Sequence, residues 1–261
     1  MVRAVFKKAG GLMLQQSKEE KIERVRQMIY NTGNIVCLVG IGVTMECGAV
    51  NFLHERECYR IEDIYHYSPE EIFSTGFYSA KKEKFFEFYK KEILSLNLTV
   101  GESLYAIKEL ERWGKLKGCV TSNVYGLPEM VGIHNIINMH GNIHENWCVK
   151  CGKHFDSDYL KNSKGVPVCD ACGSNIRPGV RLYGEMIRND VITRLADVCQ
   201  HADVLLVLGT NLYDSMVKNA LRYYNGNKLV LITKHEHFTD KKADIVIHDE
   251  VNKVLPKIVW Q

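Results

Sequence analysis

The stretch Ile35-Val36-Cys37-Leu38-Val39-Gly40-Ile41-Gly42-Val43-Thr44 decides the fold. Five consecutive apolar residues that end at a glycine predict a short strand buried on both faces. A glycine-rich turn at the end of such a strand lets the backbone approach a phosphate, and a helix start behind it supplies N–H donors. The Gly-x-Gly-x-x-Gly pattern is incomplete because Met45 occupies its last position. An ordinary strand-exit turn therefore explains these residues about equally well.

Apolar runs and helical patterns alternate along the rest of the chain. Strands are expected at 118–121, 136–139, 204–208, 229–232 and 245–247, and helices at 19–30, 103–113, 190–201, 215–224 and 251–259. The aromatic and charged region 59–92 is typical of several short helices, one of them starting at Ser68-Pro69. This alternation predicts an α/β fold with a doubly wound, Rossmann-like parallel sheet.

Composition excludes several classes of protein. The chain has 261 residues, of which 46% are hydrophobic and 25% charged, so we expect one large globular domain, alone or with a small one. A net charge of +3 gives no basic field, so nucleic acid is not an expected partner. No apolar run approaches the roughly 18 residues of a membrane helix, and residues 1–15 do not resemble a signal peptide. Nine cysteines, an odd number, argue against a full disulfide framework and favour a reducing, cytoplasmic location.

Two cysteine pairs form the strongest motif. Cys148 and Cys151 make the first pair and Cys169 and Cys172 the second, with 17 residues between the pairs. Four thiolates suit Zn²⁺ and close its coordination shell, so this zinc should be structural. Two redox-active pairs are the alternative. The other cysteines are expected to be core or idle thiols: Cys37, Cys47, Cys58, Cys119 and Cys199.

The cysteine-rich stretch interrupts the strand and helix pattern. We therefore expect a zinc-binding insertion at 146–173, to which part of the helical region 55–95 contributes. The Rossmann-like domain should comprise 35–145 and 174–261, preceded by an N-terminal helical segment at 1–34.

Polar residues follow three of the expected strands. They are Thr121-Ser122-Asn123, His140-Gly141 and Gly209-Thr210-Asn211. Ligands of open α/β sheets bind beyond the carboxyl ends of the strands, which favours one dinucleotide-sized crevice here. His140 could act in it as a general base because its pKa is near neutrality. Ordinary loops, and a structural or solvated histidine, remain the alternatives.

In this order the motifs resemble those of sirtuins, the NAD-dependent protein deacylases, from about Ile35 to Leu255. The family's Gly-Ala-Gly-Ile-Ser and Gly-Ile-Pro-Asp-Phe-Arg align with residues 40–44 and 48–53, and its Thr-Gln-Asn-Val-Asp-Gly-Leu-His with 121–128. Its His-Gly pair aligns with 140–141, and its Ile-Gly-Thr-Ser with 208–211. Arg177-Pro178 and Tyr183-Gly184-Glu185 resemble the family's substrate-binding loop.

The resemblance implies two ligands and one partner: NAD as co-substrate, one structural zinc ion, and an acylated lysine of a protein or peptide. His140 would be the general base and Asn123 would hold the ribose. Tyr183, Gly184 and Glu185 would pair with the substrate backbone as an added strand. The products would be nicotinamide, free lysine and an acylated ADP-ribose. The implied cofactor-binding residues are Gly40, Ile41, Gly42, Thr44, Phe52, Ser122, Asn123, Tyr125, Gly209, Thr210, Asn211 and Thr233.

The chain departs from the family at several of these positions. Leu53 replaces an arginine, Ser122 a glutamine, Ile41 an alanine and Thr233 an asparagine. Tyr125 replaces the aspartate that holds the nicotinamide carboxamide, and it could hydrogen-bond that amide or fill its pocket. Two alternatives to a deacylase therefore stay open: a module that binds NAD, ADP-ribose or acylated protein without turnover, and a mono-ADP-ribosyltransferase.

The motifs also bear on the acyl group. The Tyr-x-x-Arg pair that some sirtuins use for acidic acyl groups has no clear match, because Tyr65-His66-Tyr67 lacks an arginine. A basic residue in the pocket would favour acidic acyl chains by charge pairing. Without one, acetyl or longer apolar acyl groups are expected.

Overall fold

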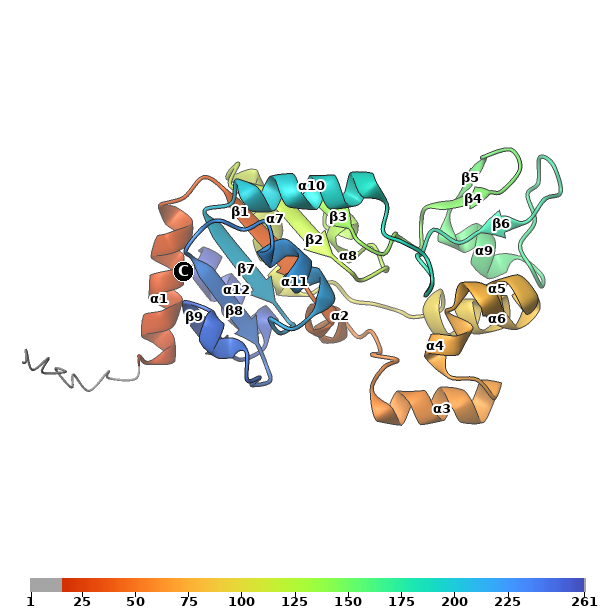
Figure 1. The fold of residues 1–261 in the computed structure, drawn as a ribbon, viewed down its shortest axis with the longest axis horizontal. Helices are drawn as coiled ribbons and strands as arrows, with labels where there is room; N and C mark the ends of the chain where they lie inside the picture. The colour runs from red at the N-terminus through yellow and green to blue at the C-terminus, as the bar shows by residue number, and fades with distance from the viewer. Residues whose placement is uncertain (1–15, 261) are drawn as a thin grey trace, which may run out of the picture.

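A six-stranded sheet forms the centre of the protein in the computed structural model, which describes residues 16–260 (Figure 1). Its neighbours run in the order β3-β2-β1-β7-β8-β9, and every pair is parallel. The strands are β1 (Ile35–Val39), β2 (Leu116–Thr121), β3 (Ile136–Asn138), β7 (Val204–Leu208), β8 (Leu229–Thr233) and β9 (Ile245–His248). This topology confirms the predicted doubly wound α/β fold. The interpretation of residues 1–15 lies outside the described part of the chain.

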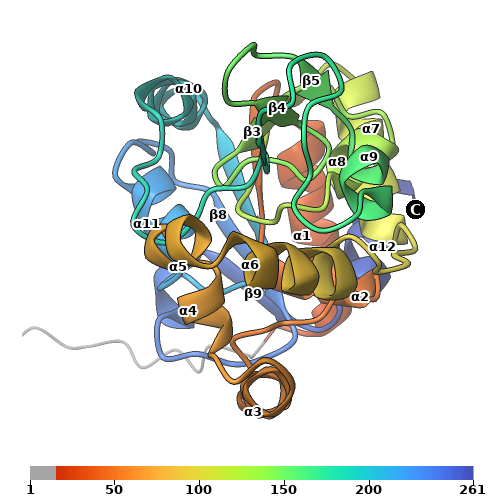
Figure 2. The same cartoon turned by 90° about the vertical axis from the view of Figure 1, so that its right-hand side faces the viewer.

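Helices cover both faces of the sheet (Figure 2). One face carries α1 (Lys18–Tyr30), α7 (Glu102–Arg112) and α12 (Val251–Trp260), and the other carries α10 (Asn189–Gln200) and α11 (Ser215–Leu221). The side chains of β1 alternate between the two cores: Cys37 packs with the first set of helices, and Val36 and Leu38 pack with the second. Because both faces are covered, all five residues of β1 are buried, which explains its uninterrupted apolar sequence.

A helical segment leaves the sheet after β1. After α2 (Ile41–Glu46), it consists of α3 (Glu55–Tyr65), α4 (Pro69–Ile72), α5 (Thr75–Ala80), α6 (Lys82–Phe88) and the π-helical turn η1 (Tyr89–Ile93). Ser68 caps α4 through its side chain and Pro69 occupies the first turn, as the sequence predicts. Aromatic rings hold the helices together, and the Phe85 and Tyr89 rings stack with centroids 5.5 Å apart.

A small antiparallel sheet leaves the central sheet after β3. It has the order β5-β4-β6, formed by β4 (Asn146–Cys148), β5 (His154–Phe155) and β6 (Ile176–Arg177), with α9 (Ser157–Asn162) beside it. β6 lies beyond the boundary predicted for the cysteine-rich insertion. Figure 1 shows this sheet next to α5 and α6, at the end of the molecule away from α1. The Nζ of Lys90, in the helical segment, donates to the carbonyls of Ser163 and Gly165, at 2.6 Å each. These bonds connect the helical segment to the cysteine-rich stretch.

Most element boundaries agree with the sequence within one or two residues, with two exceptions. Helix α11 ends at Leu221 rather than at 224. Helix α2 begins directly at Ile41, because Gly40 adopts the extended backbone of a helix cap, with φ −89° and ψ −178°. Within residues 16–260, no helix combines the length and the hydropathy needed to cross a bilayer.

Candidate functional site

The strand register brings three polar turns to one edge of the sheet. Val39 at the end of β1 pairs with Thr121 on one side and Leu208 on the other. The amide of Gly42 donates to the carbonyl of Gly209 at 2.8 Å. A Cβ on Gly42 would lie 2.6 Å from that oxygen, so the two turns touch only because residue 42 is a glycine. Gly42 thus allows the turn after β1 to approach the turn after β7 closely.

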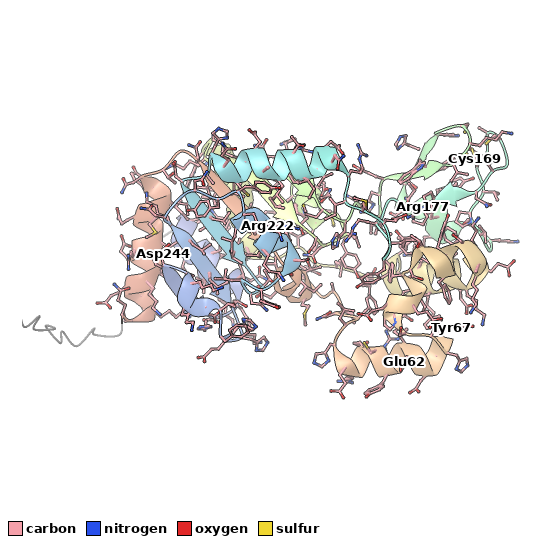
Figure 3. All side chains as sticks on the ribbon, in the orientation of Figure 1. Glu62, Tyr67, Cys169, Arg177, Arg222 and Asp244 are labelled. Atoms are coloured by element: carbon pink, nitrogen blue, oxygen red, sulfur yellow. The ribbon has the colours of Figure 1, made fainter. Side chains whose placement is uncertain are left out.

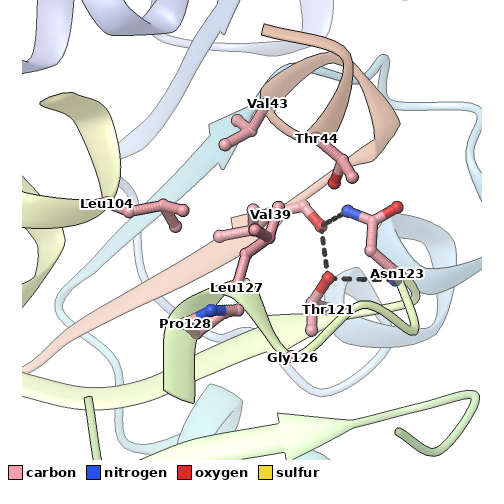
Figure 4. Close-up of a pocket in the computed structure, with 9 residues that line it drawn as sticks. All are labelled: Val39, Val43, Thr44, Leu104, Thr121, Asn123, Gly126, Leu127 and Pro128. Atoms are coloured by element: carbon pink, nitrogen blue, oxygen red, sulfur yellow. Dashed lines mark hydrogen bonds between the residues drawn. The ribbon is translucent and has the colours of Figure 1, made fainter. Parts of the chain in front are cut away.

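Asn123 is fixed at this edge by its backbone and its side chain (Figure 4). Its amide N–H donates to Thr121 Oγ1 at 3.0 Å, and its Nδ2 donates to the carbonyl of Gly40 at 3.0 Å. Thr121 Oγ1 in turn donates to the carbonyl of Val39 at 3.1 Å. Asn123 and Thr44 line a cavity of about 10 Å³, enough for a single water at most. These bonds hold Asn123 rigidly between the ends of β1 and β2.

A cavity of about 470 Å³ lies beside this edge, and residues of the helical segment after β1 also line it. Seven predicted site residues line it: Ile41, Phe52, Ser122, Asn123, Tyr125, His140 and Tyr183. Eight others lie outside its lining: Gly40, Gly42, Thr44, Gly184, Glu185, Gly209, Thr210 and Asn211. Thr233, at the end of β8, is also outside the lining. The size and mixed polarity suit a small-molecule or peptide site.

His140 stands in the wall of this cavity, and its surroundings shift its pKa strongly. Burial, and then the positive charge of Arg181, lower the pKa of His140 to about 4, against an opposing effect of Asp214. Arg181 Nη2 lies 2.9 Å from His140 Nε2. A guanidinium can only donate, so Nε2 is the acceptor and the ring proton is assigned to Nδ1. His140 is therefore neutral at physiological pH, as a general base must be.

Phe52 and Tyr125 form aromatic parts of the cavity wall. Phe52 packs edge-on against Phe88, with centroids 5.8 Å apart. Tyr125 is only 7% exposed, and burial raises the pKa of its hydroxyl well above its usual value, so this group stays protonated and able to donate. Leu53, which stands where the family has arginine, is 57% exposed at the rim.

The segment 180–183 lines the cavity and is bonded both to the turn after β3 and to the helical segment that follows β1. The amide of Arg181 donates to the carbonyl of His140 at 2.8 Å, and that of Tyr183 to the carbonyl of Phe73 at 2.8 Å. Thr75 donates back to the carbonyl of Tyr183 at 3.0 Å. The Glu185 carboxylate is held by the guanidinium of Arg177 at 2.7 Å. The amide and the carbonyl of Tyr183 are thus both hydrogen-bonded to the helical segment.

Three charged residues of the cavity are absent from the sequence-based site: Glu70, Arg181 and Asp214. The local signal for Arg181 is that it stands between two apolar residues, Val180 and Leu182, which are 3% and 1% exposed in the structure. This pattern indicates an arginine beside the core but does not place it near His140. Asp214 reads as an ordinary helix cap, and its Oδ1 indeed accepts from the amides of Met216 and Val217 at the start of α11.

The four clustered cysteines form a metal site in the small sheet; Figure 3 marks Cys169 at this end of the molecule. All four sulfurs lie within 4.8 Å of one another, with 3.4 Å between Cys148 and Cys172 and 3.6 Å between Cys151 and Cys169. A tetrahedron with Zn–S bonds of about 2.3 Å has edges of about 3.8 Å, so the cluster fits a structural zinc ion. Among the other cysteines, Cys37, Cys47, Cys119 and Cys199 are buried and Cys58 is partly buried.

The fold and these two sites define a doubly wound α/β protein with a Cys₄ zinc module. The Sir2 family matches residues 40–214. An NAD-dependent protein deacetylase of Clostridium tetani is 37% identical over 238 residues, which are 91% of this chain and 96% of that protein. One of Clostridium perfringens is 36% identical over 242 residues, or 92% and 99%. The chain therefore belongs to the Sir2 family, the sirtuins.

Solved structures agree with this assignment. A Sir2 homologue in complex with NAD superimposes with a TM-score of 0.77 at 28% identity, over 91% of this chain and 92% of that chain. A mutant Sir2 homologue in complex with ADP-ribose gives a TM-score of 0.79 at 29% identity, over 91% and 94%.

Proposed function

We propose that the protein is an NAD-dependent protein-lysine deacylase. The observation that carries this function is the meeting of His140 and Asn123 in one cavity at the carboxyl edge of the sheet, in a chain of the Sir2 family. NAD, when bound, supplies the ribose that accepts the acyl group and the nicotinamide that leaves.

Each protein group has a defined task in this reaction. His140, neutral because of burial and the nearby Arg181, accepts the proton of a ribose hydroxyl at Nε2. Asn123, held by Gly40 and Thr121, orients the ribose. Phe52, anchored on Phe88, excludes water from the sugar carbon.

Three further groups frame the ligands. Tyr125 offers its protonated hydroxyl as a donor at the nicotinamide end. The substrate backbone adds beside Tyr183, Gly184 and Glu185. The ends of β7 and β8, with Gly209, Thr210, Asn211 and Thr233, form the adenosine side of the site. The cytoplasmic location stays a prediction.

The test is to mix purified protein, NAD and a set of acyl-lysine peptides, and to detect nicotinamide and acyl-ADP-ribose by mass spectrometry. We expect both products, and a loss of about 10²- to 10⁴-fold in turnover for His140→Ala. Binding of NAD or ADP-ribose without nicotinamide release would instead establish a binding module. Transfer of ADP-ribose to protein would establish a transferase.

A further inference from the structure

Arg181 places a cation in the cavity wall that has no anionic partner among the described residues. Its Nη2 lies 2.9 Å from His140 Nε2, and its Nη1 donates to the carbonyl of Glu185 at 2.6 Å. Its Nε is buried and has no hydrogen-bond partner within residues 16–260. The neighbouring Arg177, by contrast, forms an ion pair with Glu185. Desolvated guanidinium groups are normally paired, so Arg181 has donor capacity left for a ligand.

The surroundings of Arg181 favour an anion that comes from outside. Phe52, Val180 and Leu182 make part of the wall apolar, which strengthens a charge pair formed there. Of the two carboxylates in the lining, Asp214 already accepts two amide N–H groups of α11, and Glu70 is exposed. Neither forms an ion pair with Arg181 within residues 16–260.

We propose that Arg181 binds the free carboxylate of a dicarboxylic acyl group, such as malonyl or succinyl, on the substrate lysine. The inference rests on the proposed deacylase function and names the acyl class that the same cavity takes. It replaces the expectation of an acetyl or apolar acyl group. That expectation assumed that the pocket lacks a basic residue, whereas the fold brings Arg181 beside His140.

Charge and geometry both support this assignment. A guanidinium donates to a carboxylate through two parallel N–H bonds, which are about twice as strong as neutral hydrogen bonds. Arg181 occupies the lone pair of His140 Nε2, the atom that must accept the ribose proton. A carboxylate is a stronger acceptor than a neutral imidazole, so an acidic acyl chain draws the guanidinium away and frees Nε2. A neutral acyl chain of equal length offers no such exchange.

The test compares peptides of one sequence that carry butyryl-lysine or succinyl-lysine, with kcat/KM measured from acyl-ADP-ribose formation. We expect the wild-type protein to favour succinyl by about 10- to 100-fold, the equivalent of a charge-assisted hydrogen bond. Arg181→Gln should abolish this preference, and Arg181→Lys should keep part of it. Arg188→Gln is the matched control, because Arg188 is an exposed arginine paired with Asp190 outside the cavity.

A wild-type protein that turns over butyryl-lysine as well as or better than succinyl-lysine would overturn the inference and leave the deacylase standing. Retention of the succinyl preference by Arg181→Gln would also overturn it. Fluorescence anisotropy with the same two peptides and ADP-ribose makes the result independent of turnover. Tighter, Arg181-dependent binding of the succinyl peptide without nicotinamide release would support the acyl class and refute the deacylase. If Arg181→Gln fails to fold, the wild-type comparison and Arg181→Lys decide.

Discussion

Arg181 Nη2 and His140 Nε2 are 2.9 Å apart, so the proposed general base of this sirtuin is hydrogen-bonded to a cation. The contact has two consequences of opposite sign. It adds to the effect of burial in keeping His140 neutral, which a base requires, and it occupies the nitrogen through which that base would act. Activity should therefore depend on whether another group, such as a substrate carboxylate, replaces His140 as the hydrogen-bond acceptor of the Arg181 guanidinium.

The first prediction concerns the pH dependence of NAD turnover in Arg181→Gln. The positive charge of Arg181 lowers the pKa of His140, so its removal raises that pKa from about 4 toward the ordinary value. A base works only when deprotonated, so the acid limb of kcat/KM moves to higher pH. Burial, the largest cause of the shift, remains and keeps the limb below about 6.5. Arg188→Gln should leave the profile unchanged; an unmoved acid limb in Arg181→Gln would contradict this coupling.

The second prediction concerns the hydroxyl of Tyr125, which burial keeps protonated. If it donates to the nicotinamide carboxamide, Tyr125→Phe removes one hydrogen bond and raises KM for NAD by about 3- to 10-fold. Steady-state kinetics at saturating peptide measure this change. Tyr30→Phe is the control, because Tyr30 is 75% exposed on α1. An unchanged KM in Tyr125→Phe would mean that the ring only fills space.

The third prediction concerns the contact between the ends of β1 and β7. A Cβ on Gly42 would lie 2.6 Å from the carbonyl oxygen of Gly209, and backbone atoms there cannot move aside cheaply. Gly42→Ala should lower the free energy of unfolding by about 1–3 kcal/mol, measured by urea denaturation. Gly33→Ala is the matched control, since no described residue other than its chain neighbours has an atom within 4 Å of its Cβ position. It should change stability by less than about 0.5 kcal/mol. Equal stability of the two variants would refute the argument.

The fourth prediction concerns the zinc module. Cys169→Ser should lose the metal, and its thermal midpoint should fall by about 5 °C or more, because a closed Cys₄ site contributes folding energy directly. Atomic absorption and thermal unfolding measure the two effects. Cys58→Ser should keep both properties of the wild-type protein, since its sulfur lies outside the cluster and donates to the carbonyl of Phe52. Zinc retained at full occupancy in Cys169→Ser would exclude the predicted ligand set.

The small sheet shows why part of the fold could not be predicted. β5 and β6 have two residues each, too few to show any alternation, and polar turns surround them. Each is separated from β4 by a stretch that carries at least one of the clustered cysteines, so no continuous hydrophobic pattern indicates the pairing. Strands β1, β7 and β8 are the opposite case, because each is a mostly apolar run of five residues, long enough to be recognised.

The amino-acid sequence by itself determined the doubly wound sheet and the pairing of four cysteines in a cluster, because burial on both faces and metal coordination impose local patterns of residue types. The same strand pattern placed His140 and Asn123 at strand ends. Only the tertiary structure decided that Arg181 contacts His140 across 41 residues of chain and that Asp214 lines the same cavity. Neither contact leaves a local pattern. Each arises where segments from different insertions and strand ends are brought together, and electrostatic coupling depends on distance in space rather than along the chain.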